Sequence, residues 1–405
     1  MKSGNVNRLV QASADLVQVQ PRARMDWPDV AKGLSILGVV ILHVALNIPG
    51  GKESVISQIN TFLDPLRMPL FFLVSGFFSV KVLHQTFGEL FRTRLWFFLV
   101  PYLFWTPIDI FGGQVEGYLY RDTDLAGFGF YLLKIFGSAN MYWFLYFLIL
   151  FNVLLWATRK LPGWMIASVI MVVPWLFMPM FGDNEVVRKC IIYLPAFFIG
   201  AYFRPLIEKF ADAASRPRAI VFAGVFYGVG MVINSLEEIL THRTPGPAQL
   251  WFIAMKNDFA ALFGGELSAF DLGHFSGMLI RVISLPMGIV LAVWLAKIRP
   301  VAEMLKFFGR HTLVIYIGHS LGLTMIFGYF LKWTVMDIDA DSSHLFHSTG
   351  MWMVIAFLCA MAGAYIVHLI ARVPILGWAL VPPGLPRPRQ DETPSEEEQA
   401  RRISA

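Results

Sequence analysis

Two ionisable residues share one face of the first apolar segment of this 405-residue chain. The run Val30–Ile48 is long and apolar enough to cross a bilayer, yet it contains His43, and Lys32 lies eleven residues before it. Eleven residues make close to three α-helical turns, so both side chains lie on one face. Because an ionisable group inside a membrane segment is costly, it marks a functional candidate. We predict that Lys32 binds an anionic substrate and that His43 acts as a base.

The same stripe continues to Asn47, which we predict to contact a substrate. Counted at 1.5 Å per residue from Pro28, His43 lies roughly 22 Å along the helix, about two-thirds of the way across a bilayer. An anionic donor would therefore dock near Lys32, and its reactive end would extend towards His43. A structural imidazole bonded to a neighbouring helix is the alternative, which the shared face of Lys32 and Asn47 makes less favourable.

A second set of candidates lies on other apolar segments. Arg92 and Arg94 precede the third segment and are predicted to bind donor phosphates, although a positive-inside anchor also explains two arginines there. His319, a second histidine within a membrane segment, is a candidate catalytic partner of His43, and a packed polar residue is the alternative. Arg67 and Trp143 are candidate acceptor contacts, and Trp143 equally fits an aromatic belt at the membrane interface.

Composition predicts an all-α, polytopic membrane helical bundle. The chain is 56% hydrophobic and 15% charged, whereas soluble domains contain about 25% charged residues. Basic residues are scattered through loops, so nucleic acid is not an expected partner, and no metal-ligand spacing predicts a metal. About ten apolar segments are long enough to be membrane helices, near 28–48, 66–84, 94–111, 141–158, 163–181, 189–204, 218–236, 277–297, 311–331 and 350–371.

The charge distribution predicts that both termini are cytoplasmic. With this topology, most of the 33 lysines and arginines flank the inner ends of the segments, as the positive-inside rule requires. We expect a cytoplasmic tail over 1–27, the membrane domain over 28–375 and a disordered cytoplasmic tail over 384–405. The apolar segment 250–263 contains Lys256 and Asp258 and is expected to be interfacial or re-entrant.

Several of these motifs resemble one family. The segment Asp29–His43 resembles the first helix of the acyltransferase-3 family of integral membrane O-acyltransferases, in which a basic residue precedes histidine by eleven positions. Further similarity lies in Met68–Phe77, the arginines before the third segment, Tyr142–Tyr146 and Thr312–His319. The similarity extends over roughly residues 25–375 and is closest to the fucose-acetylase-like branch.

The resemblance implies an acyl-CoA-dependent O-acyltransferase in the plasma (inner) membrane. Such an enzyme moves a short acyl group, usually acetyl from acetyl-CoA, to a hydroxyl of a cell-envelope glycan or glycolipid, and it needs no metal. The resemblance assigns His43 as catalytic, Lys32 as its basic partner, and Arg92 and Arg94 as donor-binding. One departure concerns these arginines, which are separated by Thr93 alone, whereas the family pattern has two residues between them.

Two points stay open. The segment Trp27–Gly33 resembles actinobacterial members, which makes a trehalose mycolate one acceptor to consider. A transporter or flippase for a lipid-linked or anionic substrate is the rival prediction, because transporters also carry ionisable residues in the membrane. The sequence contains no inverted repeat and no matched pair of interrupted helices, which are usual in transporters.

Overall fold

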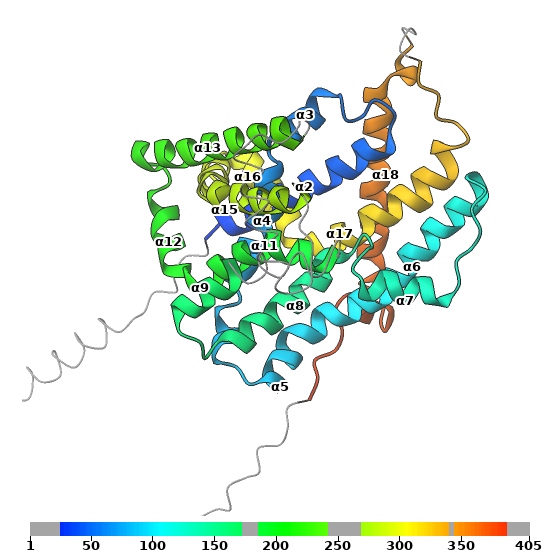
Figure 1. Cartoon of the computed structure of the whole chain (residues 1–405). Coiled ribbons are helices and arrows are strands. Elements are labelled where there is room, and N and C mark those ends of the chain that lie inside the picture. Colours follow the sequence, from blue (N-terminus) through cyan, green and yellow to red (C-terminus); the bar gives the residue numbers. More distant parts are fainter. Residues whose placement is uncertain (1–24, 172–184, 242–268, 340–343, 387–405) are drawn as a thin grey trace, which may run out of the picture.

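The computed structural model describes residues 25–171, 185–241, 269–339 and 344–386, and every regular element in these ranges is helical (Figure 1). The α-helices of the first half are α2 (Trp27–Asn47), α3 (Val55–Phe62), α4 (Asp64–Phe77), α5 (Phe87–Leu90), α6 (Trp96–Tyr120), α7 (Phe128–Phe136), α8 (Trp143–Thr158) and α9 (Gly163–Met171). Those of the second half are α11 (Glu185–Tyr202), α12 (Arg204–Ala213), α13 (Pro217–Thr241), α15 (Ala269–Leu295), α16 (Arg299–Arg310), α17 (Thr312–Leu321) and α18 (Thr349–Ile370).

Shorter helical elements join them. The 3₁₀ helices are η1 (Val80–His84), η4 (Leu345–His347) and η5 (Leu376–Ala379). Two π-helices, η2 (Phe91–Leu95) and η3 (Gly322–Lys332), are continuous with α6 and α17 respectively. Because π-helical turns are rare and often accompany functional sites, both segments are of interest for the site described below.

Six helical stretches in the described ranges are long and apolar enough to cross a membrane. They are Trp27–Asn47, Phe87–Tyr120, Pro217–Ser235, Ser276–Leu295, Thr312–Lys332 and Thr349–Ile370. The pair Val186–Tyr202 and Arg204–Ala213, bent by 85°, would make a seventh, and Trp143–Thr158 is a shorter apolar helix. The all-helical prediction is thus confirmed for the described ranges. The count of about ten, the orientation and the tail boundaries stay predictions, and the segment 250–263 lies outside the described residues.

Helices of the bundle cross closely at glycines. A Cβ added at Gly33 of α2 would overlap the backbone of α16, and one at Gly76 of α4 would overlap the carbonyl of Phe197 in α11. Gly318 and Gly363 bring α17 and α18 together in the same way. Small residues allow this close approach between membrane helices.

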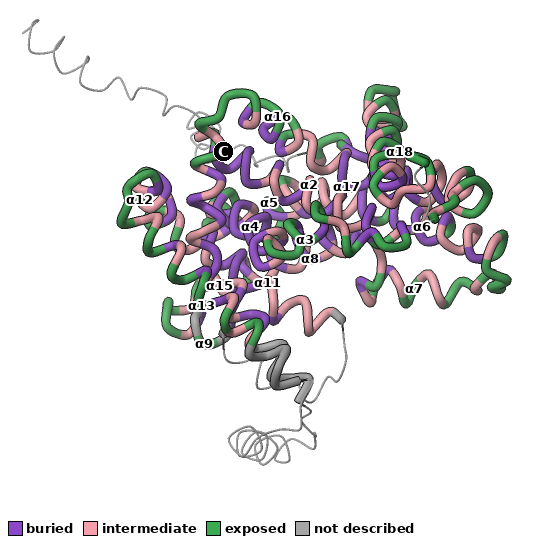
Figure 2. The backbone as a smooth tube through the Cα atoms, turned by 90° about the horizontal axis from the view of Figure 1, so that it is seen from above, coloured by how far each residue is buried: buried purple, intermediate pink, exposed green. Residues whose placement is uncertain are grey.

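The outer surface remains apolar on several helices. Figure 2 shows buried residues concentrated on central helices such as α2, α4 and α17, whereas α12 and much of α18 carry exposed residues. Exposed large apolar side chains of α13 include Val221, Phe222, Val225 and Val229. Because water would penalise such a surface and lipid does not, this pattern is typical of helices that face a bilayer.

Candidate active site

The two intramembrane histidines meet in the centre of the bundle. His43 of α2 and His319 of α17 have ring centroids 5.2 Å apart, with the rings nearly perpendicular at 85°. His319 is completely buried, whereas His43 is half-buried. Neither imidazole is among the described residues that line the cavities below, and His43 is the more exposed of the two. The structure brings together the pair that the sequence proposed as catalytic partners.

Hydrogen bonding defines the tautomer of His319. Its Nδ1 lies 3.0 Å from the carbonyl oxygen of Ile315, one turn earlier in α17. A carbonyl oxygen only accepts, so Nδ1 carries the proton and Nε2 of the neutral ring presents a lone pair. This Nε2 is buried and has no hydrogen-bond partner among the described protein groups. A buried acceptor of this kind is unfavourable for folding, which indicates a role other than stability.

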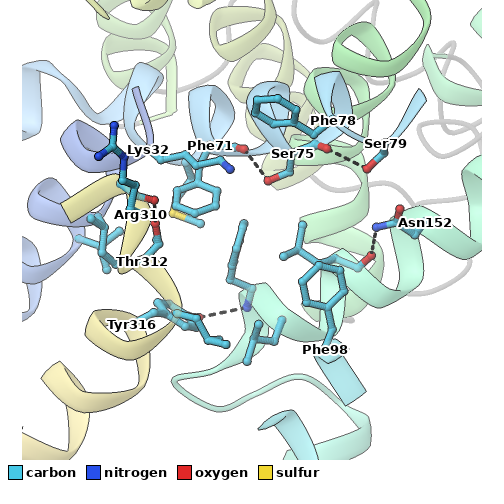
Figure 3. Close-up of a pocket in the computed structure, with 18 of the residues that line it drawn as sticks. Lys32, Phe71, Ser75, Phe78, Ser79, Phe98, Asn152, Arg310, Thr312 and Tyr316 are labelled. Carbon is cyan, nitrogen blue, oxygen red and sulfur yellow. Dashed lines mark hydrogen bonds between the residues drawn. The ribbon is translucent and has the colours of Figure 1, made fainter. Parts of the chain in front are cut away.

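A cavity of about 280 Å³ approaches the histidine pair from one end of the bundle. Its lining residues come from α2, α4 and the two residues after it, η2, the start of α6, α8, α16 and α17, and most of them are apolar. Figure 3 shows Lys32 and Arg310 on one side of this first cavity and Phe98 and Asn152 on the other. The lining also includes Val39 and Tyr316, which lie one helical turn before His43 and His319 respectively.

Three cationic residues line the first cavity, and each comes from a different element. The Nζ of Lys32 lies 4.8 Å from the centroid of the Phe78 ring. The guanidinium of Arg94 donates to Ser79 Oγ at 2.9 Å and to the carbonyl of Phe78. The cavity thus combines cationic groups with a long apolar wall.

Arg310 is the third cation, and the sequence analysis did not select it. Its Nε lies 3.2 Å from Oδ2 of Asp29, an ion pair that joins α16 to the start of α2. A signal was present, because Arg310 immediately precedes the segment that carries His319. The sequence could not show that Arg310 lies near Lys32, because this depends on how α16 packs against α2.

Arg92 and Arg94 separate in the structure. Arg94 lines the first cavity, whereas Arg92 is not among the described residues that line it. The Arg92 side chain donates from Nε to the carbonyl of Gly88 at 2.9 Å and from Nη1 to that of Pro386 at 3.4 Å. Residues two positions apart on a helix point in different directions, so a shared role was geometrically unfavourable.

A thin layer of polar groups closes the far end of the first cavity. Tyr316 lines this cavity, and its hydroxyl donates to the carbonyl of Met141 at 2.7 Å. The backbone N–H of Phe144 donates to the same hydroxyl at 3.1 Å. Tyr142, fully buried beside Tyr316, donates its hydroxyl to the carbonyl of Ile317 at 2.9 Å. These bonds fix the start of α8 against α17.

A second cavity, of about 560 Å³, lies on the other side of this layer. Met141, whose carbonyl accepts the Tyr316 hydroxyl, is part of its lining. The lining also includes the buried carboxyl of Asp109, which accepts a hydrogen bond of 2.5 Å from the hydroxyl of Ser320, the residue after His319. One side chain, Tyr316, therefore reaches from the first cavity to the wall of the second.

Asp109 was missed by the sequence analysis, although the signal was clear. It lies between Ile108 and Ile110 in a helix that is otherwise apolar for many residues, and a carboxyl group in such a segment is a functional candidate. Its link to Ser320 could not be read from the sequence, because the two residues lie on different helices, α6 and α17.

The remaining predicted site residues do not line either cavity. Asn47 donates from Nδ2 to the carbonyl of His43 at 2.9 Å and accepts from Nζ of Lys332 at 3.0 Å, so it joins the end of α2 to η3. Arg67 pairs with Asp64 at 2.6 Å. Trp143 stacks on the ring of Tyr193, with centroids 5.5 Å apart. Their predicted contacts with a substrate stay predictions.

Within the described residues, no group of three or more histidine, cysteine, aspartate or glutamate side chains is arranged to hold a metal ion. The groups that the site itself supplies are imidazoles, hydroxyls, one carboxyl and several cations. This set suits acid–base chemistry on an anionic substrate.

Comparison with known families agrees with this chemistry. The acyltransferase-3 family model, described as an acyltransferase domain, matches residues 25–369. The chain therefore belongs to the acyltransferase-3 family, which suggests a membrane acyltransferase, and with its apolar helices a multi-pass membrane protein. No curated protein and no solved structure shows significant similarity to the chain.

Proposed function

We propose that this protein transfers a short acyl group, such as acetyl, from acyl-CoA to a hydroxyl of a cell-envelope glycan or glycolipid. The observation that carries the proposal is the first cavity, which has Lys32, Arg94 and Arg310 in its lining and reaches to within one helical turn of His43 and His319. Membership of the acyltransferase-3 family supports the reaction class.

The lining of the first cavity suits the phosphates and the pantetheine arm of an acyl-CoA. The three cations would bind its phosphates through charge-assisted hydrogen bonds. The pantetheine arm, which is extended and largely uncharged, would occupy the apolar part of the cavity. Lys32 and His43 are eleven residues apart on α2, or about 16 Å at 1.5 Å per residue, so an extended arm is needed to bring a thioester to His43.

His43 acts as the general base in the proposed reaction. It removes the proton from the acceptor hydroxyl while the hydroxyl oxygen attacks the thioester carbonyl carbon. The carbon–sulfur bond breaks, the new ester forms, and the proton held by His43 passes to the departing CoA thiolate. His319 positions the His43 ring through the contact between their rings. An acyl-histidine intermediate is the alternative, in which His43 attacks the thioester first and the acceptor then removes the acyl group.

The proposal includes a location. Both termini are assigned to the cytoplasm, so acyl-CoA binds from the cytoplasmic side of the plasma membrane and the acceptor from the other. The fucose-acetylase-like branch and a trehalose mycolate acceptor belong to the proposal on the sequence resemblance alone.

Transport is the competing function, and one observation favours it. Two cavities on opposite sides of a thin layer also fit a protein that moves a substrate across a membrane. The family match and the histidine pair favour acyl transfer, since transport alone does not require a base.

The test is release of CoA by the purified full chain in detergent, with acetyl-CoA as donor and envelope lipid extract as acceptor. We expect extract-dependent release by the wild type, and a loss of at least about 100-fold in His43→Ala, as for removal of a general base. A His43→Ala protein that is folded and fully active would refute the catalytic assignment. If the folded wild type neither binds acetyl-CoA nor releases CoA, the transport alternative is favoured.

A further inference from the structure

The second cavity lies on the side of the bundle opposite the proposed donor site. Asp109, midway along α6, and Gln114, further towards its C-terminal end, line this cavity. Arg94, which lines the first cavity, lies just before the N-terminal end of the same helix. Further lining comes from α7, α11 and the residues before α8. A substrate in this cavity would approach the histidine pair from the side that the donor does not use.

The lining suits a molecule rich in hydroxyl groups. Asp109 supplies a carboxyl and Gln114 supplies an amide. Asn140 also belongs to the lining, but its amide already donates to the Tyr102 hydroxyl and the Lys134 carbonyl and accepts from the Tyr142 N–H. Asp109 is buried and hydrogen-bonded to Ser320, the neighbour of His319, so a hydroxyl bound to this carboxyl lies close to the catalytic pair. Carboxylates and amides are groups that recognise hydroxyls by directional hydrogen bonds.

Positive charge from two separate helices converges on the same cavity. Lys134 belongs to α7, and Arg188 and Lys189 belong to α11. Among the described lining residues, Asp109 is the one acidic side chain. The ammonium of Lys189 also lies 4.7 Å from the centroid of the Trp143 ring and donates to the carbonyl of Ser138 at 3.4 Å. Clefts lined by one sign of charge concentrate ligands of the opposite sign.

We propose that the second cavity binds the acyl acceptor, and that this acceptor is a sugar that carries a negative charge. The inference rests on the proposed acyl transfer and adds the class of its acceptor. Asp109 and Gln114 bind hydroxyls, and Lys134, Arg188 and Lys189 bind the carboxylate or phosphate. The hydroxyl to be acylated is directed past Tyr316 towards His43.

Binding of sugars that differ in charge tests the inference without requiring turnover. The probes are methyl glucuronide, glucose 6-phosphate and the neutral methyl glucoside, each titrated into the full chain in detergent. We expect at least one anionic probe to bind about fivefold or more tightly than the neutral one, and the difference to shrink at high salt. The double variant Lys134→Gln/Arg188→Gln should lose this preference, whereas Arg121→Gln, at the end of α6 outside the cavity lining, should retain it.

The outcomes separate the two proposals. Equal binding of charged and neutral sugars by the wild type, or a preference that survives in the double variant, would overturn the acceptor assignment. If CoA release depends on His43 but the protein binds charged and neutral sugars equally, the transfer reaction stands and this inference fails. If the charge preference is present but acetyl-CoA is never turned over, the cavity is an anionic-sugar site and the proposed transfer is wrong.

Discussion

Replacement of His319 by leucine should separate stability from activity. Leucine has a similar volume, so the substitution avoids both a large cavity and overpacking. It removes the hydrogen bond from Nδ1 to the Ile315 carbonyl, worth about 1 kcal/mol. That carbonyl keeps its helical bond to the N–H of residue 319, four positions later.

The same substitution also removes the buried Nε2, which has no partner among the described protein groups. A buried acceptor left without a partner costs about 1–3 kcal/mol. The net effect of His319→Leu on the free energy of unfolding is therefore about 0 to 2 kcal/mol of stabilisation. In a chain of this size, Tm should stay constant or rise by a few degrees at most.

Activity should change in the opposite direction. Without the contact at 5.2 Å between the rings, His43 loses the group that holds its orientation. We expect kcat for CoA release to fall by about 100-fold, with KM for acetyl-CoA unchanged because His319 does not line the first cavity. The assay combines thermal unfolding with steady-state CoA release, and His84→Leu, at an exposed position, serves as the control. A large loss of stability together with normal kcat would refute the argument.

Three further predictions concern donor binding, packing and the alignment of the catalytic helices. Arg94→Gln should raise KM for acetyl-CoA by about tenfold, because a charge-assisted contact with the donor is lost. Arg92→Gln, outside the first cavity, should change this KM by less than twofold. Equal effects of the two substitutions in steady-state kinetics would contradict the assignment of the first cavity as the donor site. Gly33→Ala should destabilise the protein by about 1–3 kcal/mol, because the added Cβ overlaps the backbone of α16. In Gly129→Ala the added Cβ meets open space, so thermal unfolding should show a much smaller loss of stability. Lys332→Met should lower kcat by about tenfold with little change in KM for acetyl-CoA, because it removes the 3.0 Å hydrogen bond to Asn47 that joins η3 to the end of α2. An unchanged kcat would mean that this hydrogen bond does not align the two histidines.

The stripe on α2 illustrates what could be read from local sequence. Helical periodicity predicted that Lys32 and His43 share a face, and Lys32 and Val39, one turn before His43, both line the first cavity. The same periodicity should have separated Arg92 from Arg94, because residues two positions apart cannot face one direction. It gave no indication of which of the two would reach the cavity.

The sequence by itself determined the apolar helices and the polar face of α2, since each depends on residues near in the chain. Only the tertiary structure decided that His43 meets His319 and that Arg310 joins Lys32 in one cavity. It alone also placed a second cavity beyond Tyr316. These contacts join helices far apart in sequence, and they depend on which faces pack together across the whole bundle, which local periodicity does not specify.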